Sequence, residues 1–85
     1  MTNEEVLTQL REILQRDFSI PPEKVTPEAQ FRGALGMDSL DVVDLIYFLE
    51  RTFGLNAGLE AYRELHTVRK LCDFVVAHKK AAAGV

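Results

Sequence analysis

One hydroxyl group in this chain stands in a setting that suits chemical modification. Ser39 follows the glycine-containing segment 35–38 (Leu-Gly-Met-Asp) and precedes a strongly apolar helical pattern. The first residues of a helix are exposed and lie at its positive end. Ser39 could itself be a helix cap, but Asp38 is the better candidate for that role. The residues therefore predict an exposed serine, flanked by acids, that another enzyme can reach.

Other chemistries are poorly supported by the residue types. Ser39 lacks the Gly-x-Ser-x-Gly setting of a hydrolase nucleophile, and no histidine is evidently placed beside it. Asp38, Asp41 and Asp44 are spread along a helix and lack the pattern of a calcium-binding loop, so we expect no metal site. Cys72 is the only cysteine and lies among apolar residues, which predicts a buried thiol. We therefore expect a protein that is not an enzyme.

Size and charge limit the possible functions further. The 85 residues form one small domain with a net charge of −3. The segment 36–50 contains four acids and no lysine or arginine, which disfavours nucleic acid and favours basic partner proteins. The acidic first residues predict no secretory signal, and no apolar run is long enough for a membrane span. A cytoplasmic monomer is the expectation.

Apolar spacing and helix breakers predict an all-α domain. We expect helices over residues 3–17, 39–53, 56–65 and 68–79, with the third one short. A long loop over 19–37 joins the first two and would be pinned by Ile20, Val25, Phe31 and Leu35. The prediction is a four-helix bundle over residues 1–80, followed by a disordered tail over 81–85.

The second predicted helix carries two apolar stripes. One stripe is wide enough to pack on the core and comprises Val42, Leu45, Ile46, Leu49 and Phe53. Leu40, Val43 and Tyr47 gather on nearly the opposite side, with Asp44, Glu50 and Arg51 at its edges. An apolar patch with a charged rim is typical of a binding surface. The alternative is that the 19–37 loop covers this patch.

The segment 36–45 (Gly-Met-Asp-Ser-Leu-Asp-Val-Val-Asp-Leu) resembles the signature of the acyl carrier protein family. The likeness extends over nearly the whole chain and includes the long loop and Thr67-Val68 at the start of the last helix. It implies a four-helix fold of acyl-carrier type. It also implies that Ser39 carries 4′-phosphopantetheine, whose thiol would hold an acyl chain as a thioester.

The resemblance implies roles for further residues. Asp38 would assist the phosphopantetheinyl transferase that modifies Ser39 with coenzyme A and Mg²⁺. Acyl-transfer, condensing or modifying enzymes would dock on the second helix at six positions: Leu40, Asp41, Val43, Asp44, Tyr47 and Glu50. The walls of an internal acyl pocket would come from Val42, Ile46, Leu49 and Leu65.

Some positions depart from the family pattern. Bacterial fatty-acid carriers usually have an acid where Arg51 stands and several acids through the segment corresponding to 56–65. Tyr47 and Phe48 replace residues that are commonly smaller or unbranched. The resemblance allows a fatty-acid pathway, a polyketide pathway or a specialised lipid or secondary-metabolite pathway. The departures favour a specialised carrier. A peptidyl or aminoacyl carrier and an unmodified helical adaptor are the alternatives.

Overall fold

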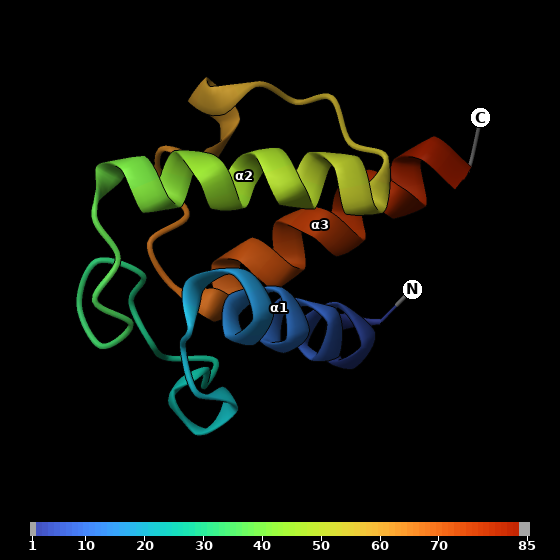
Figure 1. Cartoon of the computed structure of the whole chain (residues 1–85). Helices are drawn as coiled ribbons and strands as arrows, with labels where there is room; N and C mark the ends of the chain where they lie inside the picture. The colour runs from blue at the N-terminus through green and yellow to red at the C-terminus, as the bar shows by residue number, and fades with distance from the viewer. Residues whose placement is uncertain (1, 84–85) are drawn as a thin grey trace.

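The computed structural model describes residues 2–83, and this range is all-helical (Figure 1). Three α-helices alternate with two short 3-10 helices in the order α1 (Asn3–Phe18), η1 (Pro22–Lys24), α2 (Ser39–Phe53), η2 (Leu59–Tyr62) and α3 (Val68–Ala83). The described residues form no β-strand, only an isolated bridge between Gln30 and Thr67. The predicted all-α class is confirmed, whereas the four-helix bundle is not.

The predicted third helix over 56–65 is replaced by η2, a 3-10 helix of four residues. The chain enters η2 through Gly58, whose φ of 84° lies in a region that side-chain-bearing residues rarely adopt. The amides of Ala57 and Gly58 donate to the Glu50 carboxylate instead of starting a helical ladder. These bonds hold the chain out of helical geometry just before η2, so only one short turn forms.

Capping residues account for the helix ends. Thr2 and Glu5 form the predicted capping box of α1. The predicted bounds of α2 are confirmed, because Asp38 caps its start and Gly54 ends it with a φ of 68°. Thr67 accepts the amide of Lys70 at the start of α3.

The last helix extends further than predicted. α3 continues past residue 79 to Ala83, in keeping with the high helix propensity of alanine. The tail predicted over 81–85 therefore begins inside a described helix, and residues 84–85 lie outside the described part of the chain.

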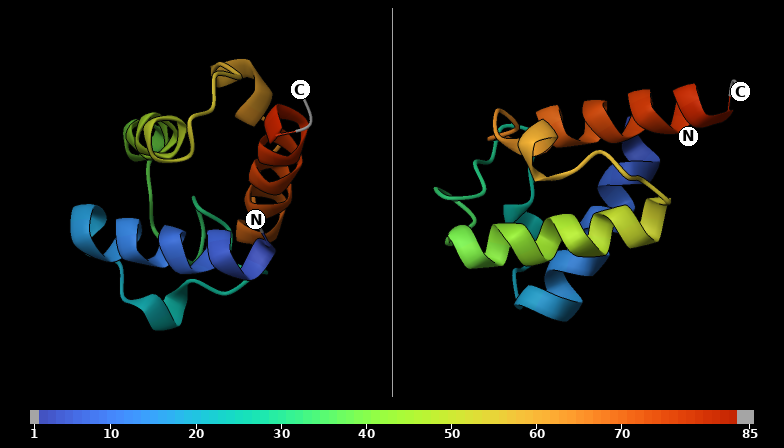
Figure 2. Two further views of the ribbon diagram at one scale, coloured as in Figure 1. Left: turned by 90° about the vertical axis from the view of Figure 1, so that its right-hand side faces the viewer. Right: turned by 90° about the horizontal axis from the view of Figure 1, so that it is seen from above.

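The three α-helices surround a single apolar core. Figure 2 shows α2 end-on in its left view, with α1 below it and α3 at the side. Each helix directs a stripe of aliphatic residues inward, and eight side chains are almost completely excluded from solvent: Val6, Leu10, Leu14, Val25, Leu45, Leu49, Val68 and Val75. No polar or charged residue among those described is buried. Burial of these side chains provides the main stabilisation of the fold.

The long loop between α1 and α2 is anchored by its own apolar residues. Ile20, Val25, Phe31 and Leu35 are buried, as the sequence predicted, and so is Met37. These contacts allow an irregular segment to remain ordered in so small a domain.

Hydrogen bonds attach the same loop to α1 and α3. The Arg11 guanidinium donates two bonds to the carbonyl of Val25, at 2.9 and 3.1 Å. Further along, the amide of Phe31 donates to the carbonyl of His66 at 3.1 Å, and that of Val68 to Ala29 at 3.0 Å. The loop is thereby held on both sides, and its end delivers Ser39 to a defined place at the start of α2.

Replacing Leu49 by alanine should lower the free energy of unfolding by about 2–5 kcal/mol, because it leaves a cavity at a fully buried site. Leu40→Ala is the matched control on the same helix. That side chain is 76% exposed, so its loss should change stability by less than about 0.5 kcal/mol. Urea unfolding measures both, and equal losses would contradict the packing described for α2.

Candidate functional site

Two aspartates form a reciprocal cap at the start of α2. The Asp38 carboxylate accepts the Asp41 amide at 2.9 Å, and the Asp41 carboxylate accepts the Asp38 amide at 3.3 Å. Ser39 is the first residue of the helix and is exposed. Because Asp38 provides the cap, the Ser39 hydroxyl is not required for it.

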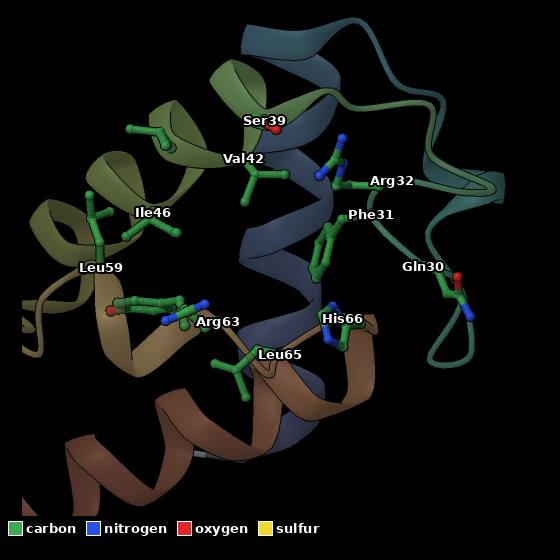
Figure 3. Close-up of a pocket in the computed structure, with 12 residues that line it drawn as sticks. Gln30, Phe31, Arg32, Ser39, Val42, Ile46, Leu59, Arg63, Leu65 and His66 are labelled. Carbon is green, nitrogen blue, oxygen red and sulfur yellow. The ribbon is translucent and has the colours of Figure 1, made fainter.

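A groove opens beside Ser39 between α2 and the segment that contains η2 (Figure 3). Its volume is about 490 Å³. The apolar part of the lining comprises Phe31, Val42, Val43, Ile46, Leu59, Tyr62 and Leu65. Ser39 lies at one end, so a group attached to its hydroxyl could extend either along the groove or into solvent.

Three of the four residues predicted to line an acyl pocket do line this groove. Val42, Ile46 and Leu65 contribute to its wall, and Val42 is half-buried rather than fully packed in the core. Leu49 is different, because it is completely buried among the helices and is not part of the groove lining. The helical spacing correctly predicted that Leu49 is buried in the core. Helical spacing alone cannot distinguish residues of the core from residues that line the groove.

Three further residues of the lining were not predicted from the sequence. Leu59 and Tyr62 come from η2, and Phe31 comes from the long loop. Their apolar side chains were the only sign in the sequence that they could line a groove. Leu59 and Tyr62 reach it from a 3-10 helix, where the sequence predicted an α-helix. Tyr62 also packs against Phe74 of α3, with ring centroids 4.9 Å apart.

The second apolar stripe of α2 faces solvent. Leu40 is 76% exposed, Val43 is 43% exposed and Tyr47 is 58% exposed, so the long loop does not cover them. Asp44 is exposed beside them. The Arg51 guanidinium lies 5.5 Å from the centre of the Tyr47 ring and donates to its hydroxyl at 3.3 Å. This end of the stripe therefore carries a positive charge.

Glu50 occupies a different environment from the other predicted docking residues. Its Oε2 atom accepts the amides of Ala57 at 2.8 Å and Gly58 at 3.2 Å, and the hydroxyl of Tyr62 at 3.2 Å. The side chain is half-buried and holds η2 against α2, so its carboxylate contributes to the fold of this segment. Helical periodicity predicted the position of Glu50 on α2. It could not predict that the segment containing Ala57 and Gly58 folds back onto this side chain.

These contacts affect the protonation of both partners. The Ala57 amide is the main cause of a Glu50 pKa below its ordinary value, with further contributions from Gly58 and Tyr62. Burial, together with the Glu50 charge, raises the pKa of the Tyr62 hydroxyl well above its ordinary value. The phenol therefore stays protonated and donates to the carboxylate at neutral pH.

Among the described residues, the cysteine thiol and the potential metal ligands do not form a second site. Burial raises the pKa of the Cys72 thiol to about 11, which keeps it unreactive at neutral pH, as its apolar neighbours predicted. Within residues 2–83 no three potential metal ligands among histidine, cysteine and the acids come together. No helix in that range is both long enough and apolar enough to cross a membrane.

Comparisons with known proteins agree with this geometry. A family model described as the phosphopantetheine attachment site matches residues 8–75. An acyl carrier protein from Rubrobacter xylanophilus is 41% identical over 81 residues, which cover 95% of this chain and 100% of that protein. Another acyl carrier protein, from Thermosynechococcus vestitus, is 41% identical over 83 residues, which cover 98% of this chain and 100% of that protein.

A solved structure shows the same fold. The crystal structure of an acyl carrier protein from Thermotoga maritima matches with a TM-score of 0.85 at 29% identity, covering 96% of this chain and 95% of that one. Fold and site together define a small helical carrier domain that takes a covalent phosphopantetheine group. The chain belongs to the acyl carrier protein family, whose members carry groups for other enzymes and are not catalysts themselves.

The residues at the start of α2 fit the covalent 4′-phosphopantetheine that this family carries. Ser39 is exposed, its hydroxyl is not needed for the helix cap, and the groove offers apolar surface next to it. Among the described residues no buried polar side-chain atom lacks a hydrogen-bond partner.

Glu50→Gln should lower the free energy of unfolding by about 1 kcal/mol at pH 7, because a neutral amide accepts the three hydrogen bonds less strongly. The folded-state pKa of Glu50 is lowered, so its stabilisation is complete above the ordinary carboxyl pKa and is lost as pH falls through the folded value. The difference between the two proteins should shrink below about pH 4.

Chemical denaturation over a range of pH measures this effect. Glu64→Gln is the control, because Glu64 is an exposed acid near the same segment. A Glu50→Gln effect that stays constant down to low pH would show that the charge of Glu50 does not hold η2.

Proposed function

We propose that this carrier bears its phosphopantetheine on Ser39 and presents acyl intermediates, bound as thioesters, to enzymes that dock on α2. The observation that carries the proposal is the exposed Ser39 hydroxyl, which the Asp38–Asp41 cap leaves available at the mouth of an apolar groove. The only cysteine of the chain, Cys72, is buried, so the reactive thiol would come from the prosthetic group.

The chain contributes position and recognition rather than acid–base chemistry. On modification the Ser39 oxygen would form a bond to phosphorus while the pyrophosphate bond of coenzyme A breaks and the nucleotide leaves. The serine proton would pass to a base of the phosphopantetheinyl transferase. Asp38, adjacent to the acceptor, would help that enzyme bind Mg²⁺ and hold the serine in place.

The groove would shelter the acyl part of the cargo. Val42, Ile46 and Leu65, together with Leu59 and Tyr62, offer apolar surface at one end of which Ser39 lies. Burial of each methylene group in such a site is worth about 0.8 kcal/mol. The open side of the groove would let a chain leave when a partner enzyme competes for it. Leu49, being buried in the core, is omitted from this proposal.

The exposed face of α2 would dock the partner enzymes. Leu40, Val43 and Tyr47 form its apolar part, and Asp41 and Asp44 would steer basic surfaces towards it. Such a face is small enough for complexes that dissociate readily, as a carrier that visits several enzymes requires. Attachment to a flexible arm replaces free diffusion by a high effective concentration at each active site.

Fatty-acid, polyketide and specialised lipid or secondary-metabolite pathways all use such a carrier. Arg51 stacked on Tyr47 gives one end of the docking face a positive charge, which favours partners of mixed charge and hence a specialised pathway. A peptidyl carrier is less well supported, since the relatives described above are all named acyl carrier proteins.

Incubation with a phosphopantetheinyl transferase, coenzyme A and Mg²⁺ should add the mass of one phosphopantetheinyl group to the wild-type protein and none to Ser39→Ala. Ser19 is the only other serine, and Ser19→Gly is the control because its φ of 57° suits glycine. Intact-mass measurement separates the three proteins. Equal modification of Ser39→Ala would contradict the assignment.

Val43→Asp should weaken the complex with an acyl-transfer enzyme while leaving the melting temperature nearly unchanged, because the Val43 side chain is 43% exposed and lies outside the core. Leu45→Asp should instead unfold the domain, because it places an unpaired charge at a buried site. Thermal melts and binding measurements on the two variants separate docking from folding. A Val43→Asp melting temperature as low as that of Leu45→Asp would place Val43 in the core.

A further inference from the structure

The groove beside Ser39 contains basic residues but no acid. Arg32, Arg63 and His66 contribute to its lining, although the chain as a whole has a net charge of −3. Arg63 is already engaged with Glu60, with a distance of 3.4 Å between Nη1 and Oε2. The ion pairs found among the described residues involve Arg16, Arg63 and Arg69, and Arg32 is not among them.

The backbone around Arg32 is held near Ser39 by two hydrogen bonds. The Phe31 amide donates to the carbonyl of His66 at 3.1 Å, and the Phe31 carbonyl accepts the amide of Met37 at 2.9 Å. Arg32 thus follows an anchored residue, and the loop it begins returns to the chain just before Asp38 and Ser39. Figure 3 shows the Arg32 guanidinium at the same end of the groove as Ser39.

A phosphodiester on Ser39 would be stabilised by a cation in this place. It would bring one more negative charge to a helix start where the Asp38 and Asp41 carboxylates already lie. Repulsion from these two carboxylates opposes the attraction of the positive helix start, so a further positive charge nearby would stabilise the phosphate. Guanidinium binds phosphate oxygens through two parallel N–H donors, which fixes direction as well as distance.

We propose that Arg32 binds the phosphodiester of the group attached to Ser39 and turns the arm along the groove rather than into solvent. Arg32 is a positioning residue in this account, since the acyl thioester lies at the far end of the arm. The inference rests on the proposed attachment at Ser39. With the phosphate bound to Arg32, the arm would lie over Val42 and Ile46. Without this contact, the arm would extend into solvent, where a partner enzyme can reach it.

The test compares the protein before and after complete loading, which intact mass verifies for every variant. In the wild type, loading should shift the Nε–H resonance of Arg32 and slow its exchange with water. The ³¹P resonance of the loaded wild type should differ from that of loaded Arg32→Ala. The difference should become smaller in 1 M salt, because salt weakens an ion pair that is exposed to solvent.

Two further variants make the result specific. Arg63→Ala removes the same kind of side chain from the same groove and should leave the ³¹P resonance at the wild-type position. Arg32→Lys keeps the charge without the paired donors and should give an intermediate ³¹P shift. Wild-type spectra in which loading leaves Arg32 unchanged, with the same ³¹P shift in Arg32→Ala, would overturn the inference. A wild type that gains no mass would instead contradict the attachment at Ser39.

Discussion

The reciprocal bonds between Asp38 and Asp41 are the interaction on which the rest of the site depends. Together they satisfy amide groups that every helix leaves unpaired at its start, and Asp38 takes the role that a serine in this position would otherwise have. Ser39 is therefore exposed without a loss of helix stability. The loop before Ser39 must also be held in place, or the serine would have no defined position. Hydrogen bonds to Arg11, His66 and the start of α3 hold it.

α2 serves three environments at once, which explains its unusually apolar sequence. Leu45, Leu49 and Phe53 are buried in the core, and Val42 and Ile46 face the groove. Leu40 and Tyr47 remain in solvent. A small domain gains little stability from apolar residues that stay exposed, so their presence is better explained by recognition than by folding. Glu50 completes the groove by holding η2 in place as its opposite wall.

Local signals in the sequence predicted much of this arrangement, and contacts between distant residues account for the rest. The bounds of α2 followed from its apolar stripe, the Asp38 cap and Gly54, all of which act within a few residues. The short third helix expected over 56–65 is only the four-residue 3-10 helix η2, because Glu50 accepts the amides seven and eight residues later in the chain. The roles of Phe31 and Arg32 in the groove depend in the same way on a loop that is anchored to His66. Periodicity carries no information about such contacts.

Peptide mapping of the loaded wild-type protein would show whether Ser39 is the residue that carries the prosthetic group. Trypsin cleaves after Arg32 and Arg51, and within residues 33–51 only Ser39 and Tyr47 bear hydroxyl groups. Fragmentation of this peptide should place the added phosphopantetheinyl mass on Ser39. A modification on Tyr47, on another peptide, or on none would contradict the account.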